Sequence, residues 1–305
     1  MKGKFLPIVL IALLASILFA EQAFGGAWTV PKYKVWAQYY MKWNYAKAVF
    51  SNEWKKRTIT SIGTNAFRSQ EFNQIQEIDF GVTDWLNIQW GMEHKSSTWK
   101  EYDRPPAWGP LWSEFTRKNQ GFTNVMLGVK YQVLKTPVVV SGQTRFFIYP
   151  GEYGVAHSDA APFYNANQPV IGYGESSIEQ RVLVSKKFFE KAKFPCYLNL
   201  ETGYRWNNRH VCGGWPYFAE TGVWATKNVI LKSELDGYKS HDGTGSLNEQ
   251  AYGIWRIGGI WAILAGDPIE RKGKQFNVEF TYGKSLWGKN ATAYDEYVIK
   301  VYTQF

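Results

Sequence analysis

Charged side chains recur at alternate positions within otherwise apolar segments of this 305-residue chain. In the first such segment, Lys42 shares one face with Trp36 and Gln38, while Val35 and Ala37 share the other. A row of charges on one face of an extended segment can form ion pairs, or can line a path for polar groups. The candidate functional residues lie on such faces: Lys42, Glu93, Lys130, Arg145, Arg181, Glu201, Arg205, Glu220, Glu234, Arg256, Glu279 and Lys300.

Two interpretations of these charges stay open. Because their signs are mixed, they predict no strong ion preference, and they would filter a solute diffusing through a narrow lumen. Alternatively, they form a salt-bridge network that braces the interior and passes nothing. Glu179, Lys232 and Glu296 lie on the same faces and belong to either interpretation.

An aromatic-rich stretch from Trp99 to Phe115 is the second candidate. We predict a loop here, and its rings either form an opening for an aromatic or apolar solute or pack together at a membrane interface, where Trp is common. The aromatic candidates are Trp99, Tyr102, Trp108 and Trp112.

The four histidines match no catalytic or metal-binding motif. His94, His157, His210 and His241 show no metal-ligand spacing such as H-E-x-x-H. The adjacent residues His157 and Ser158 cannot form a Ser–His dyad of the usual geometry. The sequence therefore predicts no catalytic residue, no metal site and no cofactor, with an outer-membrane enzyme as the least favoured hypothesis.

Period-2 alternation in segments of about ten residues predicts strands that expose one apolar face to lipid. About twelve such strands are expected, which is an all-β, up-and-down antiparallel transmembrane β-barrel. Their predicted positions are near 34–44, 71–82, 85–95, 122–133, 138–149, 177–188, 196–206, 216–226, 229–239, 250–263, 274–284 and 294–305.

Short and long connections alternate along the chain, as they do in outer-membrane barrels. Short connections fall at Thr83-Asp84 and Lys227-Asn228, for example. The longer ones are predicted near 45–70, 96–121, 150–176, 207–215, 240–249 and 285–293. With an even number of strands, both termini lie on the short-turn side, which is the periplasm.

Residues 1–25 are typical of a secretory signal peptide. Lys2 and Lys4 precede an apolar run that is shorter than the roughly 20 residues needed to span a membrane, and small residues follow it. Residues 26–305 are then a single barrel domain, exported to the outer membrane of a Gram-negative bacterium.

The amino-acid composition limits the classes of partner that we expect for this chain. The aromatic content of 17% favours a barrel with aromatic girdles, and the net charge of +9 is dispersed without a nucleic-acid motif. We expect outer-membrane lipids, lipopolysaccharide at the basic first loop and a small-molecule solute as partners, and no nucleic acid. The first loop carries Lys47, Lys55, Lys56, Arg57 and Arg68, and simple solvation is the alternative role of these charges.

Two further predictions concern the C-terminus and the two cysteines. Tyr297, Ile299, Val301 and the terminal Phe305 alternate toward lipid, the pattern read by the barrel-assembly machinery and its periplasmic chaperones. Cys196 and Cys212 flank a predicted strand that separates them by on the order of 25 Å, so we expect no disulfide between them.

The chain resembles a family of bacterial outer-membrane transporters labelled as associated with the meta-pathway of phenol degradation. The stretches that carry the resemblance include GGAWTVPKYKVWAQYY, EIDFGVTDWLNIQWGME and the closing YGKSLWGKNATAYDEYVIKVYTQF, in the family's order. The resemblance implies a barrel of about twelve strands that moves small, hydrophobic or aromatic molecules.

The functional expectation is passive passage of a small solute through a narrow, charged lumen. The main alternative is a plugged structural or interaction barrel whose loops bind lipopolysaccharide or a partner. A secreted soluble β protein is a further alternative, which predicts release from cells without detergent.

Overall fold

The computed structural model describes residues 26–51, 53–58, 66–103, 113–149, 176–189, 192–207, 213–241, 250–264 and 273–305. The predicted signal peptide lies outside these residues. The part of the chain described contains thirteen strands and no helix, and hence no helix long and apolar enough to span a membrane. The strands are β1 Val35–Phe50, β2 Lys56–Thr58, β3 Ala66–Thr83, β4 Leu86–Asp103, β5 Ser113–Leu134, β6 Val139–Ile148, β7 Ser177–Phe188, β8 Cys196–Asn207, β9 Gly214–Thr226, β10 Val229–Ser240, β11 Ala251–Ala262, β12 Gln275–Lys289 and β13 Ala291–Gln304.

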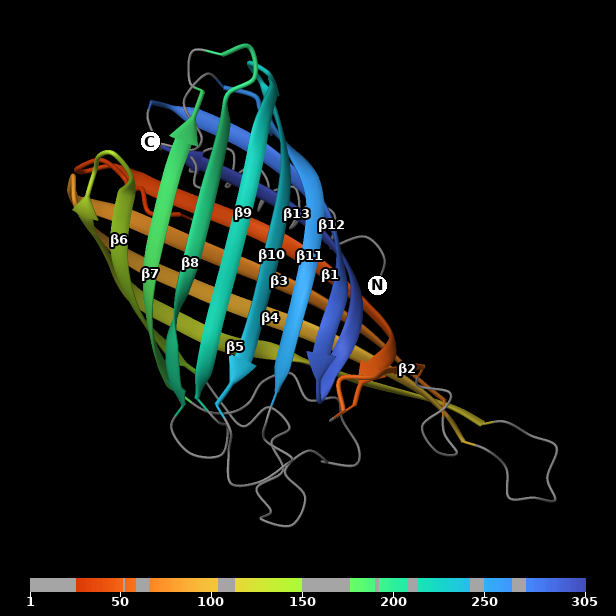
Figure 1. Ribbon diagram of the computed structural model, residues 1–305. Coiled ribbons are helices and arrows are strands. Elements are labelled where there is room, and N and C mark those ends of the chain that lie inside the picture. The colour runs from red at the N-terminus through yellow and green to blue at the C-terminus, as the bar shows by residue number, and fades with distance from the viewer. Residues whose placement is uncertain are drawn as a thin grey trace, which may run out of the picture.

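Twelve of these strands close into one antiparallel barrel (Figure 1). Each long strand pairs with its neighbours in sequence, and β13 pairs with β1 from Trp36 opposite Gln304 to Phe50 opposite Ala291. The three-residue β2 pairs with the end of β1 that lies away from the short turns, which is here called the outer end of the barrel. The predicted all-β, up-and-down barrel of about twelve strands is therefore confirmed. Closure gives every long strand a hydrogen-bonded neighbour on each side, which is what a hydrocarbon environment requires.

The two faces of the barrel differ in polarity as the alternation predicts. Ile88 is 52% exposed on the outside, whereas its neighbours Asn87 and Gln89 are buried inside. The same contrast separates Phe280 from Glu279 and Thr281. An exposed apolar exterior and a polar interior are the reverse of a soluble sheet, and fit a barrel surrounded by lipid.

Several predicted loops are strands instead. The region 96–121 is mostly β4 and β5, so Trp99 and Tyr102 lie in β4 rather than in a loop. The predicted loop at 285–293 is also wrong, because only Asn290, whose φ is 47°, separates β12 from β13. Beyond the hydrocarbon layer both faces of a strand meet water, so the apolar alternation ends while backbone pairing continues.

Candidate functional site: the barrel lumen

The most buried ion pairs of the described residues surround Lys232 of β10. Its Nζ lies 2.6 Å from Glu220 Oε2 of β9 and 3.1 Å from Glu279 Oε1 of β12, and it also contacts Glu234 of its own strand. Lys300 of β13 joins the same group, 2.8 Å from Glu279 and 3.4 Å from Glu234. The inward faces of four strands thus bring together three carboxylates and two ammonium groups.

Arg256 of β11 extends this cluster toward the outer end. Its guanidinium bonds to Glu296 of β13, and it lies 3.0 Å from Asp236 and 3.6 Å from Glu234. Lys42 of β1 reaches the other oxygen of Glu296 at 3.7 Å. The ion pairs therefore run continuously around the wall from β9 to β1.

A second cluster occupies the wall formed by β7 and β8. Arg181 donates to Glu179 at 2.7 Å and to Glu201 at 3.0 Å, while Arg205 lies 2.6 Å from the second oxygen of Glu179. Arg145 of β6 is the register partner of Glu179. The positive charges on this wall therefore converge on Glu179.

The remaining predicted residues have separate partners. Glu93 of β4 accepts from the amides of Asn73 at 2.8 Å and Asn124 at 2.7 Å. Lys130 of β5 lies 3.9 Å from Asp79 and donates to the backbone oxygen of Gly26 at 3.2 Å. Gly26 belongs to a segment inside the barrel for which alternation predicts no strand.

Residues Gly26–Lys34, here called the strap, cross the inside of the barrel at its short-turn end. The Gly26 amide donates to Glu201 Oε1 at 3.1 Å, and the Ala27 amide donates to Ser185 Oγ at 2.7 Å. On the opposite wall Asn87, with its amide oriented to satisfy both groups, accepts from Val30 N at 2.9 Å and donates to Val30 O. The strap is therefore bonded to both sides of the lumen.

Apolar packing reinforces these polar bonds. Trp28 packs against the buried cluster of Tyr197, Ile230, Ile260 and Tyr302, which lies inside the barrel wall. Farther along the strap, a Cβ at Gly81 would lie only 2.1 Å from the Pro31 oxygen, so the strap lies directly against β3 at a position that only glycine permits. Hydrogen bonds and apolar packing together hold the strap inside the barrel at its short-turn end.

The other candidates are distributed over the barrel rather than gathered at one site. Trp99 and Tyr102 belong to β4, while Trp108 and Trp112 lie outside the described residues. Tyr297 and Phe305 are exposed on the outside at 42% and 39%, with Ile299 and Val301 half-buried between them. Their exposure matches the outward alternation expected of a closing strand.

The cysteines and histidines for which the sequence makes predictions lie only partly within the described residues. Cys196 begins β8 and Cys212 lies outside the described residues, so the absence of a disulfide between them stays a prediction. His94 lies in β4 with its ring 5.4 Å from that of Phe122, and His241 follows β10. His157 and His210 lie outside the described residues.

The strap had no periodic signal that could have revealed it. Its sequence, GAWTVPKYK, mixes apolar and polar residues without alternation and contains Pro31. The one available indication was Trp28, a large ring placed just before the first strand. Its partners Tyr197 and Tyr302 come from strands far apart in sequence, so only the closed barrel brings them together.

Comparisons with known proteins bear on the fold. No protein-family profile matches the chain, and neither does any curated protein. Among solved structures, an outer membrane channel from Pseudomonas putida F1 superimposes with a TM-score of 0.65 at 10% sequence identity, covering 93% of this chain and 100% of that chain.

Two further structures are more distant. The transport unit of the autotransporter AIDA-I from Escherichia coli has a TM-score of 0.45 at 9% identity, covering 90% of this chain and 91% of that chain. The CymD monoaromatic hydrocarbon channel has a TM-score of 0.39 at 7% identity, with coverages of 90% and 88%. Identities this low compare folds and not activities. The chain has the closed, twelve-stranded barrel fold of an outer-membrane channel.

Proposed function

We propose that this protein is an outer-membrane channel through which small solutes, hydrophobic or aromatic ones among them, diffuse passively. The apolar exterior and the predicted signal peptide support an outer-membrane location. Short turns of outer-membrane barrels face the periplasm and long connections face the cell surface. The strap then lies at the periplasmic end of the lumen.

The observation that carries the proposal is a set of charged side chains that face the inside of a closed barrel and keep part of their surface exposed there. The side chain of Lys42 is 23% exposed, that of Lys300 is 21% exposed and that of Arg205 is 28% exposed. These cations come from β1, β13 and β8, so a solute inside the lumen can reach charged groups on several parts of the wall.

In this mechanism a solute enters the lumen from outside and meets paired charges and aromatic rings. Arg205 lies over the ring of Phe147 at 4.8 Å and near Tyr238 at 5.8 Å, so this part of the wall offers flat apolar surfaces beside a cation. Passage to the periplasm requires displacement of the strap, which is held by hydrogen bonds and packing rather than by covalent links.

Conductance of the refolded protein in a planar lipid bilayer tests the proposal. We expect small, stable conductance steps that change in amplitude or ion preference when Arg145, Arg205 and Arg256 are replaced together by alanine. A heat-dependent shift in gel mobility must first show that both proteins are folded. If both are folded and electrically silent, the channel proposal fails.

A plugged structural or interaction barrel is the second candidate, and the strap together with the buried ion pairs favours it. Its surface partner would be lipopolysaccharide at the basic first connection. There Lys55 pairs with Glu53 at 2.9 Å and Lys56 lies over the Phe50 ring. Silence in the bilayer combined with binding of lipopolysaccharide would select this candidate.

A further inference from the structure

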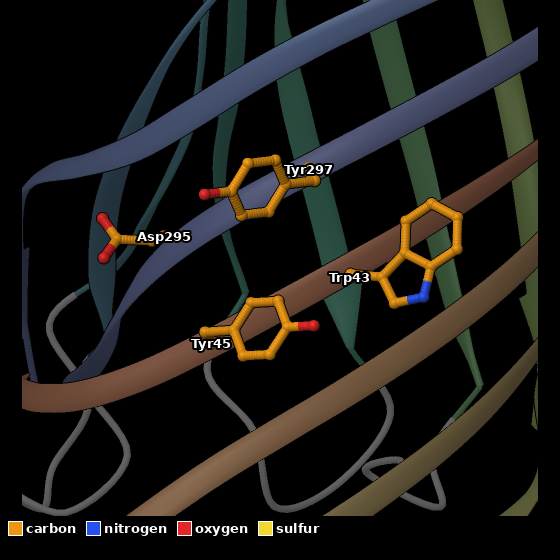
Figure 2. Close-up of a pocket in the computed structure, with 4 residues that line it drawn as sticks. All are labelled: Trp43, Tyr45, Asp295 and Tyr297. Carbon is orange, nitrogen blue, oxygen red and sulfur yellow. The ribbon is translucent and has the colours of Figure 1, made fainter.

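A hollow of about 520 Å³ opens on the outside of the barrel at the seam between its first and last strands. Figure 2 shows its lining, Trp43 and Tyr45 from β1 and Asp295 and Tyr297 from β13. These residues form two successive cross-strand pairs, Trp43 opposite Tyr297 and Tyr45 opposite Asp295. Tyr45 is 40% exposed, so the hollow opens on the outer surface of the barrel.

The neighbouring strand β12 places one more ring and a second charge beside the hollow. Tyr282 of β12 lies 5.2 Å from the Tyr297 ring, and its hydroxyl donates to Asp295 Oδ1 at 3.4 Å. Lys284 of the same strand is the register partner of Asp295 and is exposed. A carboxylate and an ammonium on the outer face of a membrane barrel are costly at the bilayer midplane and tolerated near an interface.

The depth of the hollow agrees with an interfacial position. Tyr45 and Asp295 are each separated from the short-turn ends of their strands by about ten residues, the length of tilted strand that crosses the hydrocarbon core. The hollow therefore lies where the far leaflet's hydrocarbon meets its headgroups. In the orientation proposed above, that leaflet is the outer leaflet of the outer membrane.

We propose that this hollow binds the glucosamine headgroup of an outer-leaflet glycolipid. Aromatic faces carry partial negative charge and pack well against the C–H faces of a sugar ring. The Asp295 carboxylate accepts hydrogen bonds from sugar hydroxyl or amide groups, and Lys284 is placed to meet a headgroup phosphate. The inference rests on the outer-membrane location proposed above and does not depend on solute passage.

Native mass spectrometry of the full-length protein in detergent tests this site. The protein is titrated with lipid A disaccharide and, separately, with phosphatidylglycerol, which carries a phosphate but no sugar. We expect lipid A to bind more tightly, and about fivefold more weakly after Trp43→Ala or Asp295→Asn, as the loss of one aromatic or charged contact predicts. Heat-dependent gel mobility verifies that each variant is folded.

Trp206→Ala is the matched control. Trp206 lies on the outside of β8, is 50% exposed and is a similar distance from the short-turn end, but belongs to another part of the wall. Its replacement should leave lipid A binding unchanged. Equal weakening by all three substitutions, or equal binding of phosphatidylglycerol at the hollow, would overturn the proposal. Conductance is measured separately in bilayers without glycolipid, so failure of this site is distinguishable from failure of the channel.

Discussion

At the scale of single residues, buried ammonium and guanidinium groups organise the interior. Removing a charge from water carries a large solvation cost, which is offset only by close partners of opposite sign. Lys232 has such partners in Glu220, Glu234 and Glu279. Alternation in the sequence predicts that these side chains share one face of their strands. It contained no information on which of them meet, because that depends on the register of nonadjacent strands.

Replacing Lys232 with methionine should destabilise the barrel by about 3–5 kcal/mol, because three carboxylates would remain together in a buried site without their common cation. Urea-dependent unfolding in detergent micelles measures the change. Lys95→Met is the control, since Lys95 is a more exposed cation paired with Glu71 at 2.9 Å. An equal loss of stability in both variants would contradict the special role of Lys232.

At the scale of elements, the strap is held at a position where β3 offers no side chain. The Gly81 amide donates to Lys34 O at 2.9 Å, and the Tyr33 amide donates to Gly81 O at 2.7 Å, so β3 and the end of the strap are bonded in both directions. A Cβ at this position would meet the backbone of the strap itself. In the proposed channel, the strap is therefore the element that a solute must displace at the short-turn end.

Gly81→Ala should loosen the strap and raise single-channel conductance, because the added Cβ would lie 2.1 Å from the Pro31 oxygen. Planar bilayer recording measures the effect. Gly259→Ala is the control, as a Cβ there would meet nothing closer than 3.3 Å. Trp28→Ala removes the strap's apolar anchor without a clash and should act in the same direction. Unchanged conductance in both strap variants would show that the strap does not limit passage.

The tight connection between β12 and β13 makes a second prediction at this scale. Asn290 has a φ of 47°, a left-handed conformation that asparagine tolerates and β-branched residues do not. Asn290→Val should therefore cost about 1–2 kcal/mol of stability, and Asn290→Gly should cost little. Equilibrium unfolding in urea compares the two. A valine variant as stable as the glycine variant would contradict this account of the turn.

At the scale of the whole molecule, closure between the first and last strands completes the barrel. The amide of Val35 donates to Phe305 O at 3.0 Å, and the amide of Phe305 donates to Val35 O at 3.1 Å. These bonds join the two chain ends of the domain at the short-turn side. The terminal ring lies outside, where the assembly machinery is expected to recognise it.

Phe305→Ala should keep these backbone bonds and yet lower the fraction of exported protein that reaches the folded, heat-modifiable form in cells. The expected cause is the loss of the aromatic end of the closing strand. Phe280→Ala is the matched control, because Phe280 is also an exposed outward ring but lies within β12. Gel mobility of membrane fractions measures both. An equal decrease in the two variants would attribute the effect to lost apolar surface alone.

The amino-acid sequence by itself determined the all-β architecture and the up-and-down order of about twelve strands. It could do so because alternation is local and because a barrel of neighbouring hairpins needs no long-range choice of partner. Tertiary structure alone decided the length of the strands beyond the membrane, as at Trp99 and Asn290. It also decided the burial of Lys232 among three carboxylates and the path of the strap past Trp28. These features depend on side chains from strands distant in sequence, which meet only when the barrel closes.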